Sequence, residues 1–274
     1  MRAGCMMPVE SPEFGDGRVR KRATIPKMLT IGAATLVAVL SLGVVSGGIP
    51  ILSGMSSLPS QAAVRLADFG DASPSPEARH VADWVADSRD NANAEFIVVD
   101  KRAARVYVFD ANARLRGASP VLLGAALGDD SVPGIGTRPI EEVRPEERTT
   151  PAGRFVAERG RNLKGEDVVW VDYDAAVSMH RVRATKPSEQ RLERLATPTV
   201  DDNRISYGCI NVPVAFYEAY VSPTVAAQRA IVYVLPEVKP VQQVFGSYDV
   251  VAPRRLASLN LKEVRCGLIR STNC

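Results

Sequence analysis

The stretch EFIVVDKRAARVYVFD, residues 95–110, decides the expected fold class. Its two runs of β-branched and aromatic residues flank the short segment KRAA, a pattern typical of a β-hairpin. Downstream, the run LRGASPVLLGAAL continues the sheet, and Pro120 within it indicates an edge or irregular position because proline cannot donate to a strand ladder. Further strands are predicted at 154–159, 167–173, 175–180 and 229–237. We therefore expect a mostly β domain over residues 95–237.

Short helices and one long loop interrupt the predicted strands. Residues 188–196 are predicted as a short helix, and residues 211–222 as a second helix that begins through Asn211 and Pro213. Residues 128–153 form a long loop rich in glycine, proline and charge. Loops of this length in compact domains are often functional.

The segments on either side of this domain carry weaker patterns. Residues 53–94 are small, polar and proline-containing, and we expect a stalk or linker there with one short helix at 76–90. His80, at the start of that helix, is interpreted as a surface or capping residue. The C-terminal tail, residues 238–274, is weakly patterned.

The N-terminus predicts a membrane segment. Residues 1–27 form a basic leader, and no charged residue follows until Arg65. About 20 apolar residues suffice to cross the hydrocarbon core, so residues 28–52 are long enough for a transmembrane anchor. The basic leader belongs on the cytoplasmic side, which places the remaining chain outside. The alternative is a signal peptide cleaved near Ala62. In either case the domain is exported to the cell envelope: anchored in the inner membrane with its domain in the periplasm or outside, or secreted.

Composition narrows the function classes. Hydrophobic residues make up 46% of the chain and charged residues 24%, as in ordinary soluble domains. The net charge of +3 comes from scattered basic residues without an aromatic stacking platform, so nothing indicates a nucleic-acid partner. Two histidines without a CxxC pair argue against structural zinc, and no glycine-rich phosphate loop follows a strand. We expect neither a metal nor a cofactor.

The predicted export decides which cysteines lie where disulfides can form. Cys5 precedes the predicted anchor and stays inside, whereas Cys209, Cys266 and Cys274 lie outside, where disulfides form. Either Cys266 pairs with Cys274, which leaves Cys209 as the odd thiol, or all three stay reduced.

His180 and Cys209 are the only histidine and cysteine of the predicted domain. A cysteine nucleophile needs a base to form thiolate at neutral pH, and histidine is the usual one. Gly208 permits a tight turn whose backbone N–H groups can face an oxyanion. The predicted helix after Cys209 would further favour thiolate. The alternative is a buried structural cysteine.

Three elements in order carry a family resemblance: TTPAGRF (149–155), SMHRV (178–182) and SYGCIN (206–211). Together they resemble the L,D-transpeptidase family with the YkuD-type catalytic domain. The resemblance covers residues 95–237 and implies a β-sandwich-like catalytic domain with short helices. The matching site residues are Cys209 as nucleophile, His180 as general base and acid, Tyr207 and Gly208 with Cys209 as backbone oxyanion donors, Ser206 and Asn211 as loop-shaping residues, and Arg181, whose carbonyl orients the base.

The chain departs from the family pattern twice. Tyr207 stands where the family usually has histidine, and the spacer between His180 and Cys209 is longer than usual. We expect the additional residues, 185–204, to form a lid or side wall.

The resemblance implies acyl transfer on peptidoglycan stem peptides through a Cys209 thioester. An amine on a second stem or on a protein would accept the acyl group, and water as acceptor would give L,D-carboxypeptidation. The alternatives are a non-catalytic peptidoglycan-binding module, with Tyr207 marking lost catalysis, or a cysteine endopeptidase acting on cross-links. The basic residues Arg181, Arg183, Lys186 and Arg204 could meet substrate carboxylates, but the acidic residues among them favour a solvated mixed-charge surface.

Overall fold

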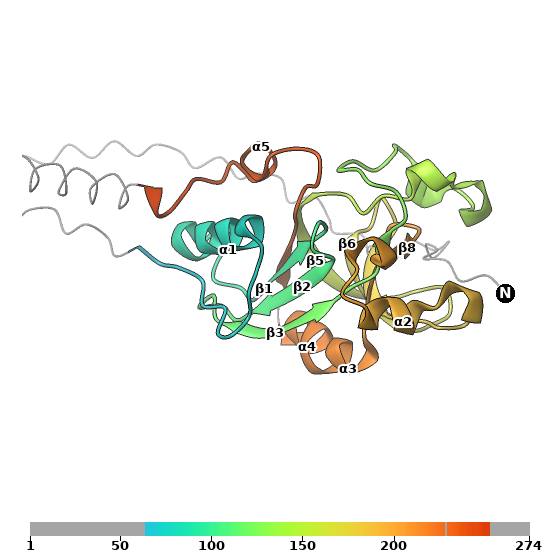
Figure 1. Ribbon diagram of the computed structural model, residues 1–274, viewed down its shortest axis with the longest axis horizontal. Helices are drawn as coiled ribbons and strands as arrows, with labels where there is room; N and C mark the ends of the chain where they lie inside the picture. Colours follow the sequence, from blue (N-terminus) through green and yellow to red (C-terminus); the bar gives the residue numbers. More distant parts are fainter. Residues whose placement is uncertain (1–63, 228, 253–274) are drawn as a thin grey trace, which may run out of the picture. The chain divides into compact units, whose positions relative to one another are not determined.

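The computed structural model describes residues 64–227 and 229–252 of the chain (Figure 1). In this part, eight strands form one sheet in the order β3-β2-β1-β10-β5-β6-β7-β9, and β4 and β8 form a two-stranded sheet. The strands are β1 Phe96–Asp100, β2 Arg105–Phe109, β3 Leu115–Pro120, β4 Leu123–Gly124, β5 Gly153–Arg161, β6 Asp167–Asp172, β7 Val177–Arg181, β8 Arg204–Ser206, β9 Ile210–Val212 and β10 Ala230–Val234.

The long strand β5 joins the two halves of the eight-stranded sheet. Its residues 153–157 pair with β10, whereas residues 158–161 pair with β6. One hydrophobic cluster takes side chains from both halves, among them Ile97 and Val232 on one side and Val169 and Met179 on the other. The prediction of a mostly β domain with short helices is confirmed. The β-sandwich-like packing stays a prediction, because most of the strands belong to one eight-stranded sheet.

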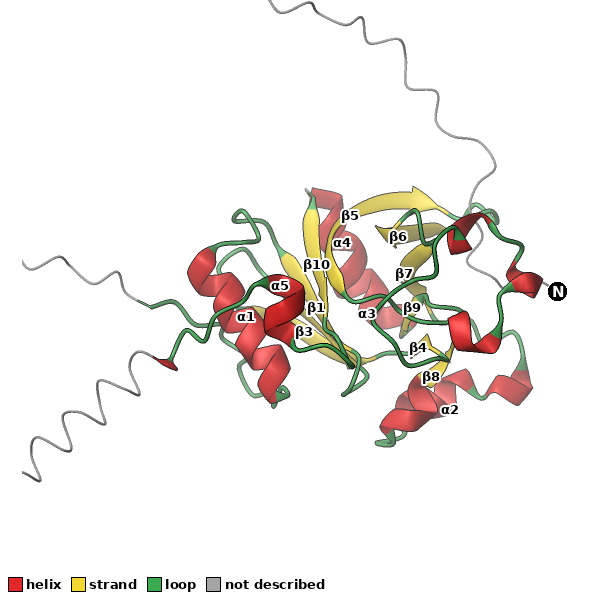
Figure 2. Ribbon diagram, turned by 90° about the horizontal axis from the view of Figure 1, so that it is seen from above, coloured by secondary structure: helices red, strands yellow, loops and turns green. Residues whose placement is uncertain are grey.

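Helices cover both faces of the β1–β10 region (Figures 1 and 2). On one face, α1 and α5 pack over an aromatic-rich cluster, and on the other α3, the π-helical turn η6 and α4 complete the cluster shared by both sheet halves. The helices are α1 Pro76–Ser88, α2 Arg191–Ala196, α3 Val214–Phe216, η6 Tyr217–Val221, α4 Ser222–Ala227 and α5 Val241–Phe245; the 3-10 turns are η1 Ile135–Thr137, η2 Ile140–Glu142, η3 Pro145–Glu147, η4 Pro187–Glu189 and η5 Val200–Asn203.

Helix α1 differs from the predicted stalk. Ser75 caps it by accepting the Ala78 N–H at 3.0 Å. Its apolar stripe, which includes Trp84, is buried against Phe96 and Tyr233. A stripe of this size needs an apolar partner, and the sheet provides one. His80 is not simply at the surface: it is half-buried, and its Nε2 lies 2.9 Å from Ser247 Oγ.

The same cluster reaches into the predicted tail. Val241 and Val250 are both buried in it, so the described core extends beyond residues 95–237 on both sides. The division of the whole chain into five segments stays a prediction, because residues 1–63 and 253–274 lie outside the described residues.

A second difference concerns the helix predicted from Asn211. Residues Ile210–Val212 form β9, which pairs in parallel with β7, and α3 begins only at Val214 with Pro213 as its N-cap. The helix predicted over 211–222 is therefore present, but it begins three residues later than expected, at Val214 after Pro213. The pairing with β7 extends the chain at this point and delays the helix.

The predicted membrane segment, residues 28–52, lies outside the described residues, as do Ala62, Cys5, Cys266 and Cys274. Across 64–227 and 229–252, no helix has the length and apolar character to span a bilayer.

Candidate active site

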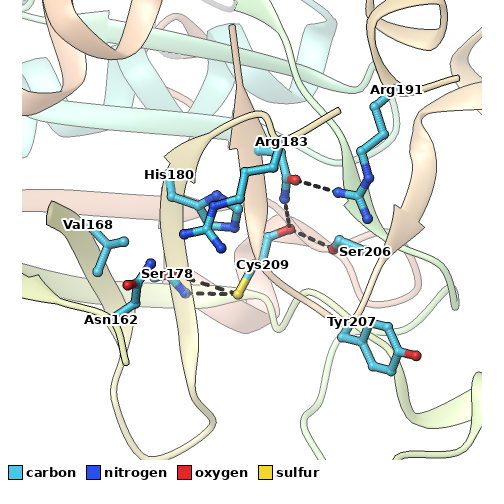
Figure 3. Close-up of a pocket in the computed structure, with 10 residues that line it drawn as sticks. Asn162, Val168, Ser178, His180, Arg183, Arg191, Ser206, Tyr207 and Cys209 are labelled. Carbon is cyan, nitrogen blue, oxygen red and sulfur yellow. Dashed lines mark hydrogen bonds between the residues drawn. The ribbon is translucent and has the colours of Figure 1, made fainter. Parts of the chain in front are cut away.

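Strands β7 and β9 place the predicted site residues by simple alternation. Successive side chains of a strand point to opposite faces. Met179 and Ile210 point into the core, which leaves His180 and Asn211 on the opposite face, where they stand in register with each other. Cys209 directly precedes β9 and lines the same pocket as His180, a pocket that is open to solvent (Figure 3).

The Cys209 side chain is buried, with an exposed fraction of 3%. Its sulfur accepts the Ser178 N–H at 3.5 Å and lies 3.7 Å from Ser178 Oγ. The sulfur also lies 3.6 Å from the Ala176 carbonyl oxygen. The sequence analysis did not name Ser178, although its place two residues before His180 puts both side chains on one face of β7.

The loop before Cys209 is tightly tied to its neighbours. Ser206 Oγ donates to the Cys209 carbonyl at 2.6 Å, and Asn211 Nδ2 donates to the same oxygen at 3.2 Å. Both residues are buried, so they shape the loop in the structure. The Gly208 N–H donates to Ser206 Oγ at 3.1 Å and is therefore engaged within the loop.

Gly208 itself is required by geometry. Its φ of +124° lies in a region that other residues rarely adopt, and a Cβ there would approach the Thr149 carbonyl oxygen to 2.7 Å. The neighbouring Thr150 donates its hydroxyl to the Gly208 carbonyl at 2.8 Å. The TTP element thus directly supports the Cys209 loop, a contact that links two segments far apart in the sequence.

His180 is held by a backbone carbonyl. Its Nδ1 lies 2.8 Å from the Arg181 carbonyl oxygen, and because a carbonyl only accepts, Nδ1 carries the proton. Burial, together with the charges of Arg191 and Arg181, lowers the pKa of His180 to about 4, although the carbonyl opposes this shift. The imidazole is therefore neutral at pH 7, with Nε2 as its proton acceptor.

Tyr207 contributes its ring to the rim of the pocket. The Arg148 guanidinium lies 3.9 Å from the ring centroid, and Arg148 also donates to the Val143 carbonyl at 3.2 Å. Figure 3 shows the ring directed away from the Cys209 side chain. The phenol is thus not placed to exchange a proton with the sulfur.

Two arginines line the pocket, and the sequence analysis named only Arg183. Arg191 comes from helix α2 of the predicted side wall, and its Nη1 donates to Asn211 Oδ1 at 2.7 Å. Helix α2 is anchored by Leu195, which packs against Leu122 and Val182. Leu195 is one turn after Arg191, so that anchor directs Arg191 toward the site. We call Arg183 and Arg191, beside Cys209, the cationic pocket.

The other basic residues considered from the sequence lie elsewhere. The Arg181 guanidinium pairs with Asp167 at 3.0 Å and with Glu218 at 2.6 Å. Lys186 pairs with Glu189 at 3.6 Å. Arg204 contacts Glu237, which removes it from the candidate substrate contacts.

A second charged group supports the Cys209 loop from behind; we call Lys101, Asp129, Arg204 and Glu237 the paired cluster. Lys101 is fully buried, lies 3.0 Å from Asp129 and donates to the Thr150 carbonyl at 2.9 Å. Although burial opposes it, backbone N–H donors and the Lys101 ammonium lower the pKa of Asp129 to about 2. The cluster therefore connects the end of β1 with the segment that holds Gly208.

The part of the chain that the structure describes contains no group of three or more histidine, cysteine, aspartate or glutamate residues that could hold a metal ion. The chemistry available at the pocket is that of a cysteine, a neutral imidazole and backbone or guanidinium donors.

Comparison with known proteins gives a limited result. No family model and no curated protein match the chain. Among solved structures, the catalytic domain of Enterococcus faecium L,D-transpeptidase aligns at 16% identity over 52% of this chain and 98% of its own, with a TM-score of 0.28. A crystal structure of a mutant of that enzyme aligns at 15% identity over 52% of this chain and 50% of its own, with a TM-score of 0.29.

The helical cell shape determining protein Pgp2 from Campylobacter jejuni aligns at 16% identity over 57% of this chain and 55% of its own, with a TM-score of 0.33. The chain spans about half the length of the mutant E. faecium enzyme. With TM-scores this low, the similarities carry no weight for function, which has to be inferred from the residues of this chain.

Proposed function

We propose that the chain is a cell-envelope cysteine acyltransferase that acts on peptidoglycan stem peptides. The observation that carries the proposal is the presence of Cys209 and a neutral, oriented imidazole in one pocket: both line it, and His180 Nδ1 lies 2.8 Å from a backbone carbonyl oxygen. A non-catalytic binding module would need neither group. The ordered TTPAGRF, SMHRV and SYGCIN elements support the substrate class by their resemblance to L,D-transpeptidases.

In the first step, His180 Nε2 takes the Cys209 thiol proton, and the thiolate attacks the carbonyl carbon of the third stem residue, a diamino acid. The C–N bond to the terminal D-Ala breaks. Protonated His180 gives its proton to the departing amine, and the acyl group stays on Cys209 as a thioester. The Ser178 N–H contacts the Cys209 sulfur at 3.5 Å and helps to hold it in position.

In the second step, an amine of another stem peptide or of a protein gives a proton to His180 and attacks the thioester. The Cys209 sulfur leaves and recovers that proton from His180, which regenerates both groups. Water in place of the amine gives L,D-carboxypeptidation, and cleavage of an existing cross-link uses the same residues. We assign the Tyr207 N–H as the oxyanion donor, because the Gly208 N–H is engaged by Ser206.

The test is mass spectrometry of muropeptides from purified sacculi incubated with the protein. We expect new cross-links or released D-Ala with the natural sequence and neither with Cys209→Ser or His180→Ala. An unchanged muropeptide profile with the natural sequence would overturn the proposal.

The envelope location is part of the same proposal and rests on the basic leader 1–27 and the uncharged segment 28–52. A reporter enzyme fused to the C-terminus should be active only outside the cytoplasm. Reporter activity inside the cytoplasm would contradict the proposed location. It would also contradict the proposed substrate, because that substrate is absent from the cytoplasm.

A further inference from the structure

Among the described residues, the lining of the cationic pocket contains two arginines and no carboxylate. Arg183 follows β7 and Arg191 begins α2, and their side chains are only 18% and 10% exposed. Both line the pocket with Cys209 and His180, and no aspartate or glutamate is among the described residues that line it.

The partners of the two arginines hold them without filling the pocket. Arg183 pairs with Glu166 and Arg191 Nε donates to Glu189 at 2.6 Å, yet neither glutamate lines the pocket. Asn211 Oδ1 accepts from Arg191 Nη1 at 2.7 Å. Arginine has five N–H donors, and among the described residues none accepts from Arg191 Nη2. Donor capacity therefore remains for a ligand.

The two guanidinium groups also affect each other. Burial, and next the nearby charge of Arg191, lower the pKa of Arg183. An anion between them would offset both the lost hydration and the repulsion. A carboxylate fits best, since guanidinium groups bind its two oxygens in a fork geometry.

We propose that Arg183 and Arg191 form a binding site for a substrate carboxylate beside Cys209. The identity of the substrate rests on the proposed function. A stem tetrapeptide offers two carboxylates within one residue of the attacked carbonyl: the terminal carboxylate of the leaving D-Ala, and the side-chain carboxylate of the diamino acid when that residue is diaminopimelate. The insert thus supplies a specificity residue, Arg191, that the family motifs do not contain.

A chemical test of the site needs no peptidoglycan substrate. The reduced protein is alkylated with iodoacetate or iodoacetamide, and modification of Cys209 is followed by peptide mass spectrometry. We divide the rate with iodoacetate by the rate with iodoacetamide. This ratio cancels differences in thiol reactivity and reports only the attraction of a carboxylate. We expect this ratio to exceed that of N-acetylcysteinamide by about tenfold or more, the size of a charge-assisted hydrogen bond.

The variants Arg183→Met and Arg191→Met should each lower the ratio several-fold, whereas Arg159→Met should not. Arg159 is an exposed arginine of β5 outside the pocket, so this control removes the same charge from the surface. Arg183→Met is the decisive variant, because Arg183 makes no hydrogen bond to the Cys209 loop that could confuse the result. A ratio equal to the reference thiol, or equal in Arg183→Met and Arg159→Met, would overturn the proposal.

Acylation with paired donor peptides then identifies the carboxylate. A tetrapeptide with a D-Ala amide terminus tests the first source, and a tetrapeptide with lysine in place of diaminopimelate tests the second. With the natural sequence, we expect one of these two donor changes to lower kcat/KM for acylation of Cys209 about tenfold or more. With Arg183→Met, the same donor change should have no such effect. A purely structural role of Arg183 would slow all donors equally and overturn the assignment. Failure of every donor to acylate Cys209 would instead overturn the proposed function, while the alkylation ratio still tests the carboxylate site.

Discussion

The paired cluster and the cationic pocket both flank the Cys209 loop, and they differ in what faces their cations. In the paired cluster, Lys101 and Arg204 meet Asp129 and Glu237, and Asp129 also accepts three backbone N–H groups from residues 237–239. In the cationic pocket, Arg183 and Arg191 face a cavity that no described carboxylate lines.

This difference separates two uses of buried charge. A buried ion is tolerated when it is paired and hydrogen-bonded, and breaking such a pair leaves an uncompensated charge at high cost. The paired cluster satisfies this condition within the protein, so its role is to hold segments together. In the cationic pocket each arginine has a glutamate partner outside the pocket, but no described carboxylate lines the side that faces the cavity, where a ligand anion can bind.

The largest expected effect breaks the paired cluster. Lys101→Met leaves Asp129 and Glu237 buried without their ammonium, and we expect a loss of about 3–5 kcal/mol in unfolding free energy. Arg183→Met, in the cationic pocket, should cost less than about 1 kcal/mol, because Glu166 is half-exposed. Urea unfolding followed by tryptophan fluorescence measures both. Equal losses for the two variants would show that the two groups do not differ in how far their charges are compensated within the protein.

The next effect concerns the loop between the two groups. Gly208→Ala places a Cβ against the Thr149 carbonyl at a φ of +124°, and strain of this kind costs about 1–3 kcal/mol. We expect acylation of Cys209 to fall by about tenfold or more. Gly165→Ala is the matched control, because Gly165 also has a positive φ but a Cβ there meets nothing within 4 Å. Normal acylation in Gly208→Ala would show that the loop is not held as described.

A smaller effect is expected in the pH dependence of His180. Because its folded pKa of about 4 lies below its ordinary value of 6.5, the unfolded chain binds the proton more readily between these values, and stability falls as pH drops through that window. The base stays neutral down to about pH 4, where the acid limb of kcat/KM should lie.

Arg191→Met sharpens this test, because it removes one of the charges that lower the His180 pKa and should move the acid limb to higher pH. The other charged groups near the ring are Arg181 and Arg183, with Glu166 and Asp167 at the adjoining surface. An acid limb near 6.5 in the natural sequence, unmoved in the variant, would contradict this assignment.

The smallest effect is expected at Tyr207. Tyr207→Phe keeps both the ring under Arg148 and the backbone N–H, so acylation should change by no more than about twofold, the scale of an exposed cation–π contact. Tyr207→Pro removes the proposed oxyanion donor, and one such donor is worth roughly 2.7–4 kcal/mol. Loss of acylation in Tyr207→Phe as complete as in Cys209→Ser would assign the chemistry to the phenol instead.

Much of the sheet could be predicted from the sequence, because local patterns determine it. The hairpin of β1 and β2 follows from two β-branched runs around KRAA, and Pro120 correctly indicated that β3 is an edge strand. The packing of α1 could not be predicted, because its short apolar stripe is flanked by a proline- and serine-rich segment typical of linkers. Strand β9 was missed because three residues after Cys209 carry little pattern, and their pairing with β7 is long-range.

The residues of the candidate site also differ in whether the sequence could predict them. Ser178 could have been found from strand alternation with His180, since both lie on one face of β7. Arg191 could not: the insert contains several cations, and the burial of Leu195 against Leu122 and Val182 decides which of them reaches the pocket. The engagement of the Gly208 N–H by Ser206 likewise depends on loop geometry that the motif does not specify.

The most direct test of the central claim is the intact mass of the protein after incubation with a stem tetrapeptide or a carbapenem. We expect an adduct on Cys209: the donor mass less D-Ala for the peptide, or the whole β-lactam for the carbapenem. The adduct should be absent in Cys209→Ser and slow to form in His180→Ala. An unmodified natural chain, or an adduct that persists in Cys209→Ser, would contradict the account.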